Sequence, residues 1–267
     1  MGELSSGLVV FVLLCGSAGL GLFVRPHLPE HHRTRENVEL TQVTISLLVT
    51  FAALVLGLLT ASVKQAYDDA ARDRQQYALQ LSSLDQCLSD YGPESAEARA
   101  NIRSYTAAVI ASTWPTEAPP AGVQYPDVSG MPRVGASPVL GAIMDQVGLE
   151  VSRLAPADTL HARIVALCLD RYKDVWRARL SVIEDTRIGL YEPFYQVLVF
   201  WLMIIFACFG LVAPRNSLSI ITIGLCAVSL SSVILVILDL SRPYEGFFAI
   251  PSATMRAALA SMLRSAH

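Results

Sequence analysis

The chain has 267 residues, of which 53% are hydrophobic and only 16% charged, and its formal net charge is −3. Its mean hydropathy of +0.46 is typical of an integral membrane protein that also has a water-soluble part. The sequence contains no basic run or aromatic-interleaved basic patch that could follow a phosphate backbone, so nucleic acid is not an expected partner.

Four uncharged apolar runs are long enough to cross a bilayer core of roughly 30 Å as helices. They cover residues 7–24, 43–63, 197–213 and 218–238. The first run does not read as a signal peptide, because residues 1–6 have no positive charge and Arg25-Pro26 is not a small-residue cleavage site. The sequence therefore predicts an all-α polytopic membrane protein with four transmembrane helices.

The stretch at residues 41–80 joins the membrane part to the soluble part. Residues 64–80 contain no proline or glycine that would stop a helix begun in the membrane. We expect one continuous helix that leaves the membrane and runs on to Tyr91, where Gly92-Pro93 ends it.

The predicted organisation places transmembrane helices one and two in residues 1–63 and helices three and four in residues 196–240. An extramembrane helical domain, residues 64–195, is inserted between helices two and three. It should contain further helices at 94–112, 139–154 and 157–190 and a Pro/Gly-rich loop at 113–138. The C-terminal tail, 241–267, ends in a short amphipathic helix that either lies at the membrane surface or packs on the domain. Asp239, at the end of the fourth run, is expected to form an ion pair or a cap.

The second apolar run has one face of small or hydroxyl-bearing residues. They recur at steps of four and three, as one stripe of a helix requires: Ser46, Thr50, Ala53, Gly57 and Thr60. Such a stripe is typical of a close helix-helix seam in lipid. It also suits the lining of a pore, and both interpretations hold if several copies surround one axis.

Cations follow the stripe along the same helix. Lys64 is its next step, and a ring of Lys64, Arg72 and Arg74 around a symmetry axis would attract anions to a pore mouth. Three carboxylates on the same stretch, at Asp68, Asp69 and Asp73, would offset part of that potential.

Cysteine and histidine residues suggest little metal chemistry. Cys87 and Cys168 lie in the soluble part, and two unpaired buried thiols are the favoured interpretation over a disulfide, which would place the domain outside the cytoplasm. His27, His31 and His32 follow the first run, but Pro26 and Pro29 disfavour the helix that would align two imidazoles as ligands. We therefore expect no metal and no cofactor, and a metal-responsive protein is the weakest of the alternatives.

Four crossings put both termini and the domain on one side of the membrane. The count of arginine and lysine residues near the helix ends is almost balanced between the two sides, and it favours a cytoplasmic domain only slightly. No motif of a serine hydrolase, a zinc protease or a phosphate-binding loop is present, so an enzyme is not expected.

Four segments together resemble the bacterial bestrophin-like membrane proteins. They are LPEHH at 28–32, LVLGLLTASVKQAYDDA at 54–70, LDQCLSDYGPESAEAR at 84–99 and DLSRPYEGFFAIPSATMRAAL at 239–259. Bestrophins are four-helix pentameric chloride channels with cytosolic termini and a pore lined by the second helix. The resemblance implies the same architecture here.

The sequence thus predicts a homo-oligomeric channel, pentameric and selective for anions such as chloride, in a bacterial inner membrane. Its pore would be lined by the stripe from Ser46 to Thr60, and its partners would be further copies of itself, lipid and anions. The alternative is a non-conducting membrane scaffold or sensor whose helical domain and long loop bind a partner.

Overall fold

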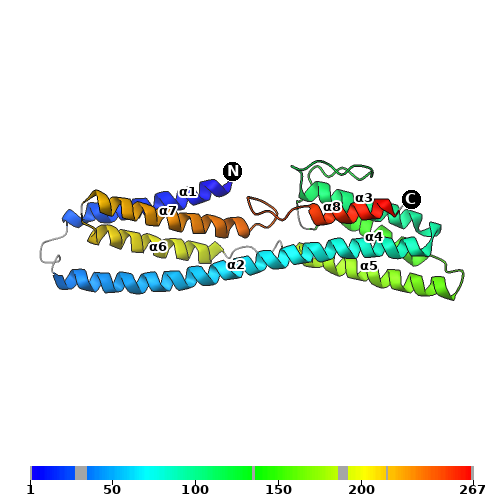
Figure 1. Cartoon of the computed structure of the whole chain (residues 1–267), viewed down its shortest axis with the longest axis horizontal. Helices are drawn as coiled ribbons and strands as arrows, with labels where there is room; N and C mark the ends of the chain where they lie inside the picture. The colour runs from blue at the N-terminus through cyan, green and yellow to red at the C-terminus, as the bar shows by residue number, and fades with distance from the viewer. Residues whose placement is uncertain (1, 28–34, 134–135, 186–191, 215, 266–267) are drawn as a thin grey trace. The chain divides into compact units, whose positions relative to one another are not determined.

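A computed structural model describes residues 2–27, 35–133, 136–185, 192–214 and 216–265. All regular elements within these ranges are helices (Figure 1), which confirms the predicted all-α class. Four of the helices are long and apolar enough to cross a membrane. The chain divides into two compact units, one of residues 1–67, 189–242 and 246–248, and one of residues 68–188, 243–245 and 249–267.

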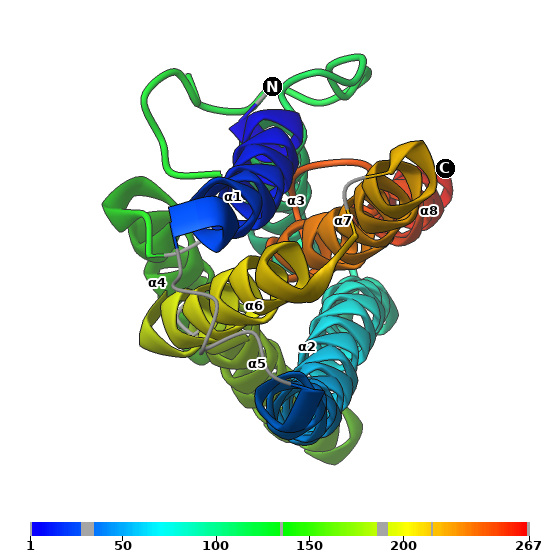
Figure 2. The same cartoon turned by 90° about the vertical axis from the view of Figure 1, so that its left-hand side faces the viewer.

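The first unit is a bundle of membrane-spanning helices. It contains α1 (Gly2–Val24), the N-terminal part of α2 (Arg35–Tyr91), α6 (Glu192–Val212) and α7 (Ser217–Leu240). α6 lies between α1 and α2, as both views show (Figures 1 and 2). The core is formed by apolar residues of all four helices, among them Leu14, Ala52, Phe206 and Ile234.

α1 and α6 approach each other closely because both have a glycine at the crossing. A β-carbon on Gly21 would overlap the carbonyl oxygen of Ala207, and one on Gly210 would overlap that of Ala18. Small residues let helix backbones pack in lipid, where the hydrophobic effect does not drive association. The crossing therefore depends on the absence of both side chains.

α2 is one helix of 57 residues, about 85 Å long at 1.5 Å per residue. Its residues belong to both units, and after Gly57 it contains neither glycine nor proline. It ends at Tyr91, as predicted, because Gly92 adopts a φ of 119° that a residue with a side chain rarely takes.

The second unit is a bundle of helices around the C-terminal half of α2. It adds α3 (Ala96–Thr113), α4 (Pro138–Arg153), α5 (Thr159–Asp185) and α8 (Ala253–Arg264). Contacts between α2 and α3 pair Tyr77 with Tyr105 and Asp85 with Arg99, so the two helices are antiparallel. This confirms the predicted hairpin, and residues 114–133 and 136–137 have no regular structure, as expected of the Pro/Gly-rich loop.

α8 packs on the second unit through its apolar face. Met255, Leu259 and Met262 are buried, and the hydroxyl of Ser265 donates to buried Asp85 at 3.1 Å. Asp85 is also contacted by Arg99, 3.3 Å away on α3. The structure thus selects packing on the domain from the two sequence alternatives for this helix.

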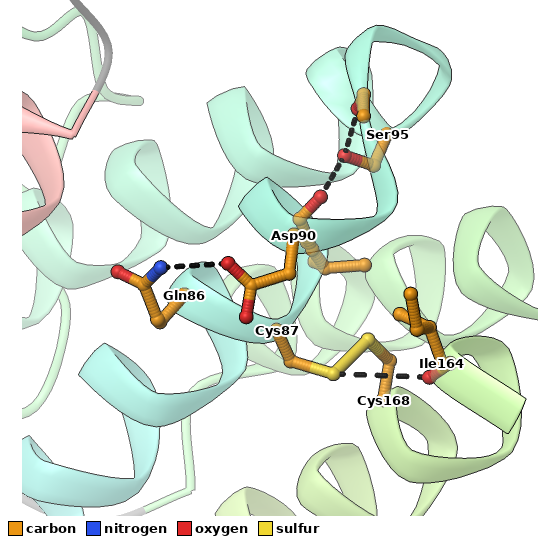
Figure 3. Close-up of a disulfide and its surroundings, with 8 residues drawn as sticks. Gln86, Cys87, Asp90, Ser95, Ile164 and Cys168 are labelled. Atoms are coloured by element: carbon orange, nitrogen blue, oxygen red, sulfur yellow. Dashed lines mark hydrogen bonds between the residues drawn. A yellow bond between two sulfur atoms is a disulfide. The ribbon is translucent and has the colours of Figure 1, made fainter. Parts of the chain in front are cut away.

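Cys87 of α2 and Cys168 of α5 form a disulfide, with their α-carbons 5.6 Å apart (Figure 3). Both residues are buried, and the Cys87 sulfur lies 3.8 Å from the carbonyl oxygen of Ile164. The expectation of two unpaired thiols is therefore wrong. The residues are separated by 81 positions, so only the packing of α5 against α2 shows that they meet.

Asp239 caps the turn after α7. Its carboxylate oxygens accept hydrogen bonds from the backbone nitrogens of Phe247 and Phe248, at 3.0 and 2.8 Å. This agrees with the structural role that the sequence predicts for it, because a buried carboxylate needs donors of this kind.

We expect Gly210→Ala to destabilise the membrane unit, because the new methyl group must push α6 away from α1. Overpacking of this kind costs about 1–3 kcal/mol. The measurement is the thermal unfolding of the full-length protein in detergent. Gly19→Ala on α1 is the matched control, since a β-carbon there meets nothing within 4 Å. Equal melting temperatures for the two variants would contradict the close crossing.

Candidate functional site

The predicted stripe lies on the outer side of α2 in the membrane unit. Ser46, Thr50, Ala53 and Gly57 are exposed, and Thr60 is half-buried. A β-carbon on Gly57 would meet nothing within 4 Å. The stripe is therefore not the seam between helices of this chain.

The membrane part of α2 has three distinct faces. At about 100° per residue, Ile45, Ala52 and Val63 share one face, which is buried, and Ala52 belongs to the core of the unit. The small-residue stripe is the second face. Exposed leucines, among them Leu47 and Leu58, form the third.

α2 is also the least buried of the four spans. Only 11% of its most apolar window is buried within the chain, against 33% for α1 and α6 and 22% for α7. Two of its three faces are thus available to lipid, to other copies of the chain or to an aqueous path.

The hydroxyl groups of the stripe are satisfied by their own helix. Thr50 donates to the carbonyl oxygen of Ser46 at 2.8 Å, Ser46 to that of Gln42 at 2.9 Å and Thr60 to that of Leu56 at 2.7 Å. A hydroxyl bonded in this way can face lipid without an unpaired donor. To donate to an anion instead, it has only to rotate.

The three cations predicted for a pore mouth lie in different surroundings. The Lys64 ammonium lies 5.7 Å from the centre of the Tyr67 ring. Arg72 keeps 70% of its side chain exposed and pairs with Asp69 at 2.8 Å. Arg74, in contrast, is only 1% exposed and lies in the interior of the helical unit. Lys64 and Arg72 are thus exposed to solvent, as a pore mouth would require, whereas Arg74 is not.

Arg74 is enclosed by aromatic rings. Its guanidinium carbon lies 4.7 Å from the centre of the Tyr244 ring and 5.2 Å from that of Trp114. Trp114 is fixed by a hydrogen bond of 2.8 Å from its indole nitrogen to the carbonyl oxygen of Ile250. Such stacking on aromatic faces stabilises a guanidinium group and leaves its edge for other partners.

A second arginine lies close to the same interior. Arg179 is buried, its guanidinium carbon is 4.7 Å from the Trp176 ring centre, and it donates to the carbonyl oxygen of Ser137 at 3.4 Å. Between the two arginines, the hydroxyls of Tyr77 and Tyr105 are hydrogen-bonded to each other. Burial raises the pKa of both tyrosines despite the nearby guanidinium groups, so both hydroxyls keep their protons.

Sequence reasoning missed this interior site, although the sequence contains a signal for it. Arg74 falls in the helical stripe that continues through Tyr77, Leu81, Leu84 and Leu88, all of them buried. A charge within an apolar stripe of this length indicates a buried cation that needs specific partners.

Asp185, at the end of α5, interacts electrostatically with Arg74. Burial, reinforced by the negative charge of Asp73, raises the pKa of Asp185 to about 6 although Arg74 lowers it. One of its oxygens, Oδ2, is buried and has no hydrogen-bond partner among the described residues.

The histidines do not form a described site. The Nδ1 atom of His27 lies 3.1 Å from the carbonyl oxygen of Phe23, and its ring stacks near that phenylalanine. His31 and His32 lie outside the described residues. Within the described ranges no group of three or more histidine, cysteine or acidic side chains could hold a metal ion.

Comparison with known proteins adds a family match. A model of the bestrophin-like domain matches residues 11–255. No curated protein matches the sequence.

Several solved structures share the fold over nearly their whole length. A variant of a bacterial bestrophin homologue from Klebsiella pneumoniae is similar with a TM-score of 0.74 and 14% identity, covering 99% of this chain and 98% of that one. A second variant of that homologue gives 0.69 and 16%, with 97% and 98% covered. A structure described as a membrane protein gives 0.70 and 14%, with 98% of each chain covered. At these identities the likeness concerns the fold.

We expect Asp185→Asn to stabilise the helical unit at neutral pH. Because the folded-state pKa of Asp185, about 6, is above the ordinary value of 3.8, its contribution to stability falls as pH rises from about 4 to about 6 and stays low above that. The variant should therefore melt higher than the parent at pH 7.5 and equally at pH 4. Asp170→Asn, on the same helix, is the control, because Lys173 lowers the pKa of Asp170 and its removal should not stabilise. A parent curve that stays flat between pH 4 and 6 would contradict this assignment.

Proposed function

The chain belongs to the bestrophin-like family, and from this membership we propose that it is a membrane ion channel formed by several copies of the chain. The family assignment agrees with the prediction of a non-enzymatic protein. The observation that supports the channel most directly is the stripe of small and hydroxyl-bearing residues on α2, of which Ser46, Thr50, Ala53 and Gly57 are exposed among the described helices.

We propose that α2 lines the pore. The span with the smallest share buried within one chain has the most surface left for neighbouring copies and a central path. Its small residues allow several copies to approach an axis without blocking it, and the hydroxyls of Ser46, Thr50 and Thr60 supply weak polar contacts to a passing ion. We propose a pentamer by analogy with bestrophins, which the sequence resembles.

Anion selectivity is the finer part of this proposal. The stripe itself is uncharged, so the sign of the permeating ion must be set elsewhere on the path. Lys64 ends the stripe, and Arg72 lies two helical turns further along α2. Arg72 pairs with Asp69, and Lys64 lies closer to the stripe, so we assign the greater part of the mouth potential to Lys64 for its position. Arg74 is buried in its own unit and is left out of the mouth.

We propose a bacterial inner membrane location with the helical unit in the cytoplasm, as in bestrophins. The Cys87–Cys168 disulfide opposes the cytoplasmic side, because cytosolic thiols are normally kept reduced. The two residues are buried, which slows exchange with soluble thiols. The redox state of this pair in living cells therefore tests the orientation.

The second candidate is a non-conducting scaffold or sensor that binds a partner through the loop at 114–137. That loop is tied to its own unit near both ends. Arg256 contacts Glu117 at 3.0 Å, and Arg133 contacts Glu245 at 3.0 Å. A loop held in this way can present a fixed surface, but no observation identifies a partner for it.

Thr50→Trp should reduce anion flux through proteoliposomes to less than about a tenth of the parent value, because an indole on the stripe of every copy narrows a path through their centre. The measurement is chloride efflux from liposomes containing the purified oligomer. Leu58→Trp, on the exposed leucine face of the same helix, is the matched control and should leave most of the flux. Equal inhibition by both variants would contradict the assignment of the pore face, and no flux from folded parent protein would favour the scaffold.

If the helical unit is cytoplasmic, Cys87 and Cys168 should be found reduced when cells are quenched with acid and their thiols are alkylated before lysis. The same pair should be oxidised after purification in air. Mass spectrometry of the two peptides measures both states and distinguishes them from the free residues Cys15, Cys208 and Cys226. A disulfide recovered from quenched cells would instead place the unit in an oxidising compartment.

A further inference from the structure

We propose that the helical unit binds a small monovalent anion, of the size of chloride or bromide, in a cavity beside Arg74. The cavity lies wholly within the second unit, among residues of α2, α3, α4, α5 and the loop before α4. None of the lining residues belongs to the α2 stripe, so an ion could bind here whether or not the protein conducts ions.

The first observation is the guanidinium group of Arg74 itself. Its Nε and Nη2 atoms are buried, and neither has a hydrogen-bond partner in the part of the chain that the structure describes. The rings of Trp114 and Tyr244 lie over the guanidinium carbon, and the Tyr244 hydroxyl is a neighbouring polar group. A buried cation with unused donors is destabilising unless something accepts from it. An anion would supply both the charge and the acceptor.

The second observation is the cavity that Arg74 lines. It holds about 30 Å³ of space open to the centre of a water molecule. One water needs roughly 10–15 Å³ by the same measure, so a single chloride-sized ion fits. The space matches a small ion or one or two waters.

The third observation is the charge and chemistry of the lining. Arg74, Arg133 and Arg179 contribute positive charge, and none of the described residues that line the cavity is an aspartate or a glutamate. The remaining polar lining comes from hydroxyl groups: Tyr77, Tyr105, Ser112 and Thr113. The raised pKa values of Tyr77 and Tyr105 keep both hydroxyls protonated at neutral pH, and because the two are hydrogen-bonded to each other, one of their protons is left for an anion. Donors and cations without carboxylates favour an anion over a metal ion.

Asp185 is an acidic residue that could compete with an anion for Arg74. It influences Arg74 electrostatically, but it is not among the residues that line the cavity, and its Oδ2 atom makes no described hydrogen bond. Arg133 is partly neutralised by Glu245. Removing the charge of Asp185 should therefore strengthen anion binding, whereas it would have no such effect if Arg74 served only a water-bridged pair with Asp185.

The test is a chloride titration of the full-length protein in detergent at pH 7.5, with gluconate replacing chloride at constant ionic strength. Gluconate is too large for the cavity. We expect the melting temperature to rise by roughly 3 °C per tenfold increase in chloride above half-saturation. Arg74→Gln should abolish this rise, and Asp185→Asn should lower the half-saturating chloride concentration several-fold.

Arg72→Gln is the matched control, because it removes an exposed arginine from the same helix and should keep the full chloride response. Thr50→Trp should keep it too, so loss of the pore and loss of this site are separable. Where Arg74→Gln fails to fold, anomalous diffraction from parent crystals soaked in bromide gives the answer. A bromide peak within hydrogen-bonding distance of Arg74 would support the site, while an empty or water-filled cavity, or a chloride response unchanged in Arg74→Gln, would overturn it.

Discussion

The uninterrupted helix α2 is the element on which both units depend. In lipid every backbone polar group must be paired within the chain, and a helix meets this requirement at each residue. In water a helix is stable mainly where its side chains pack against other elements. The C-terminal half of α2 supplies such side chains: Tyr77, Leu81, Leu84 and Leu88. Because residues 58–91 contain neither glycine nor proline, nothing interrupts the hydrogen-bond ladder between the two environments.

Polar groups on this one helix follow different rules in its two halves. In the membrane half, the hydroxyls of Ser46, Thr50 and Thr60 donate hydrogen bonds to carbonyl oxygens of the preceding turn. These three hydroxyls therefore have an acceptor within the helix. In the soluble half, Arg74 is buried beside two aromatic rings. Its Nε and Nη2 atoms have no hydrogen-bond acceptor among the described residues. The first arrangement leaves a surface that tolerates lipid, other copies or ions. The second leaves a buried positive charge whose N–H groups need an acceptor, which a bound anion would supply.

The family match and the shared fold place the chain among proteins of this arrangement, and its particular chemistry depends on its own residues. The glycine crossing joins α1 and α6, while most of the α2 stripe is exposed and contributes no packing within the described part of the unit. A surface that folding does not use is free to serve assembly or conduction. The buried face of the same helix, at Ile45, Ala52 and Val63, has no such freedom.

By itself the sequence determined the helical class, the four spans, the continuity of α2 and its end at Gly92, because hydrophobic periodicity and helix-breaking residues act locally along the chain. It also determined the stripe, since spacing on one helix fixes which side chains share a face. Only the tertiary structure decided that Cys87 meets Cys168, that α8 packs on the helical unit, and that Arg74 is buried rather than exposed beside Arg72. These three outcomes depend on which helices face each other across many residues of separation, and that pairing is set by the packing of the whole unit rather than by any local pattern.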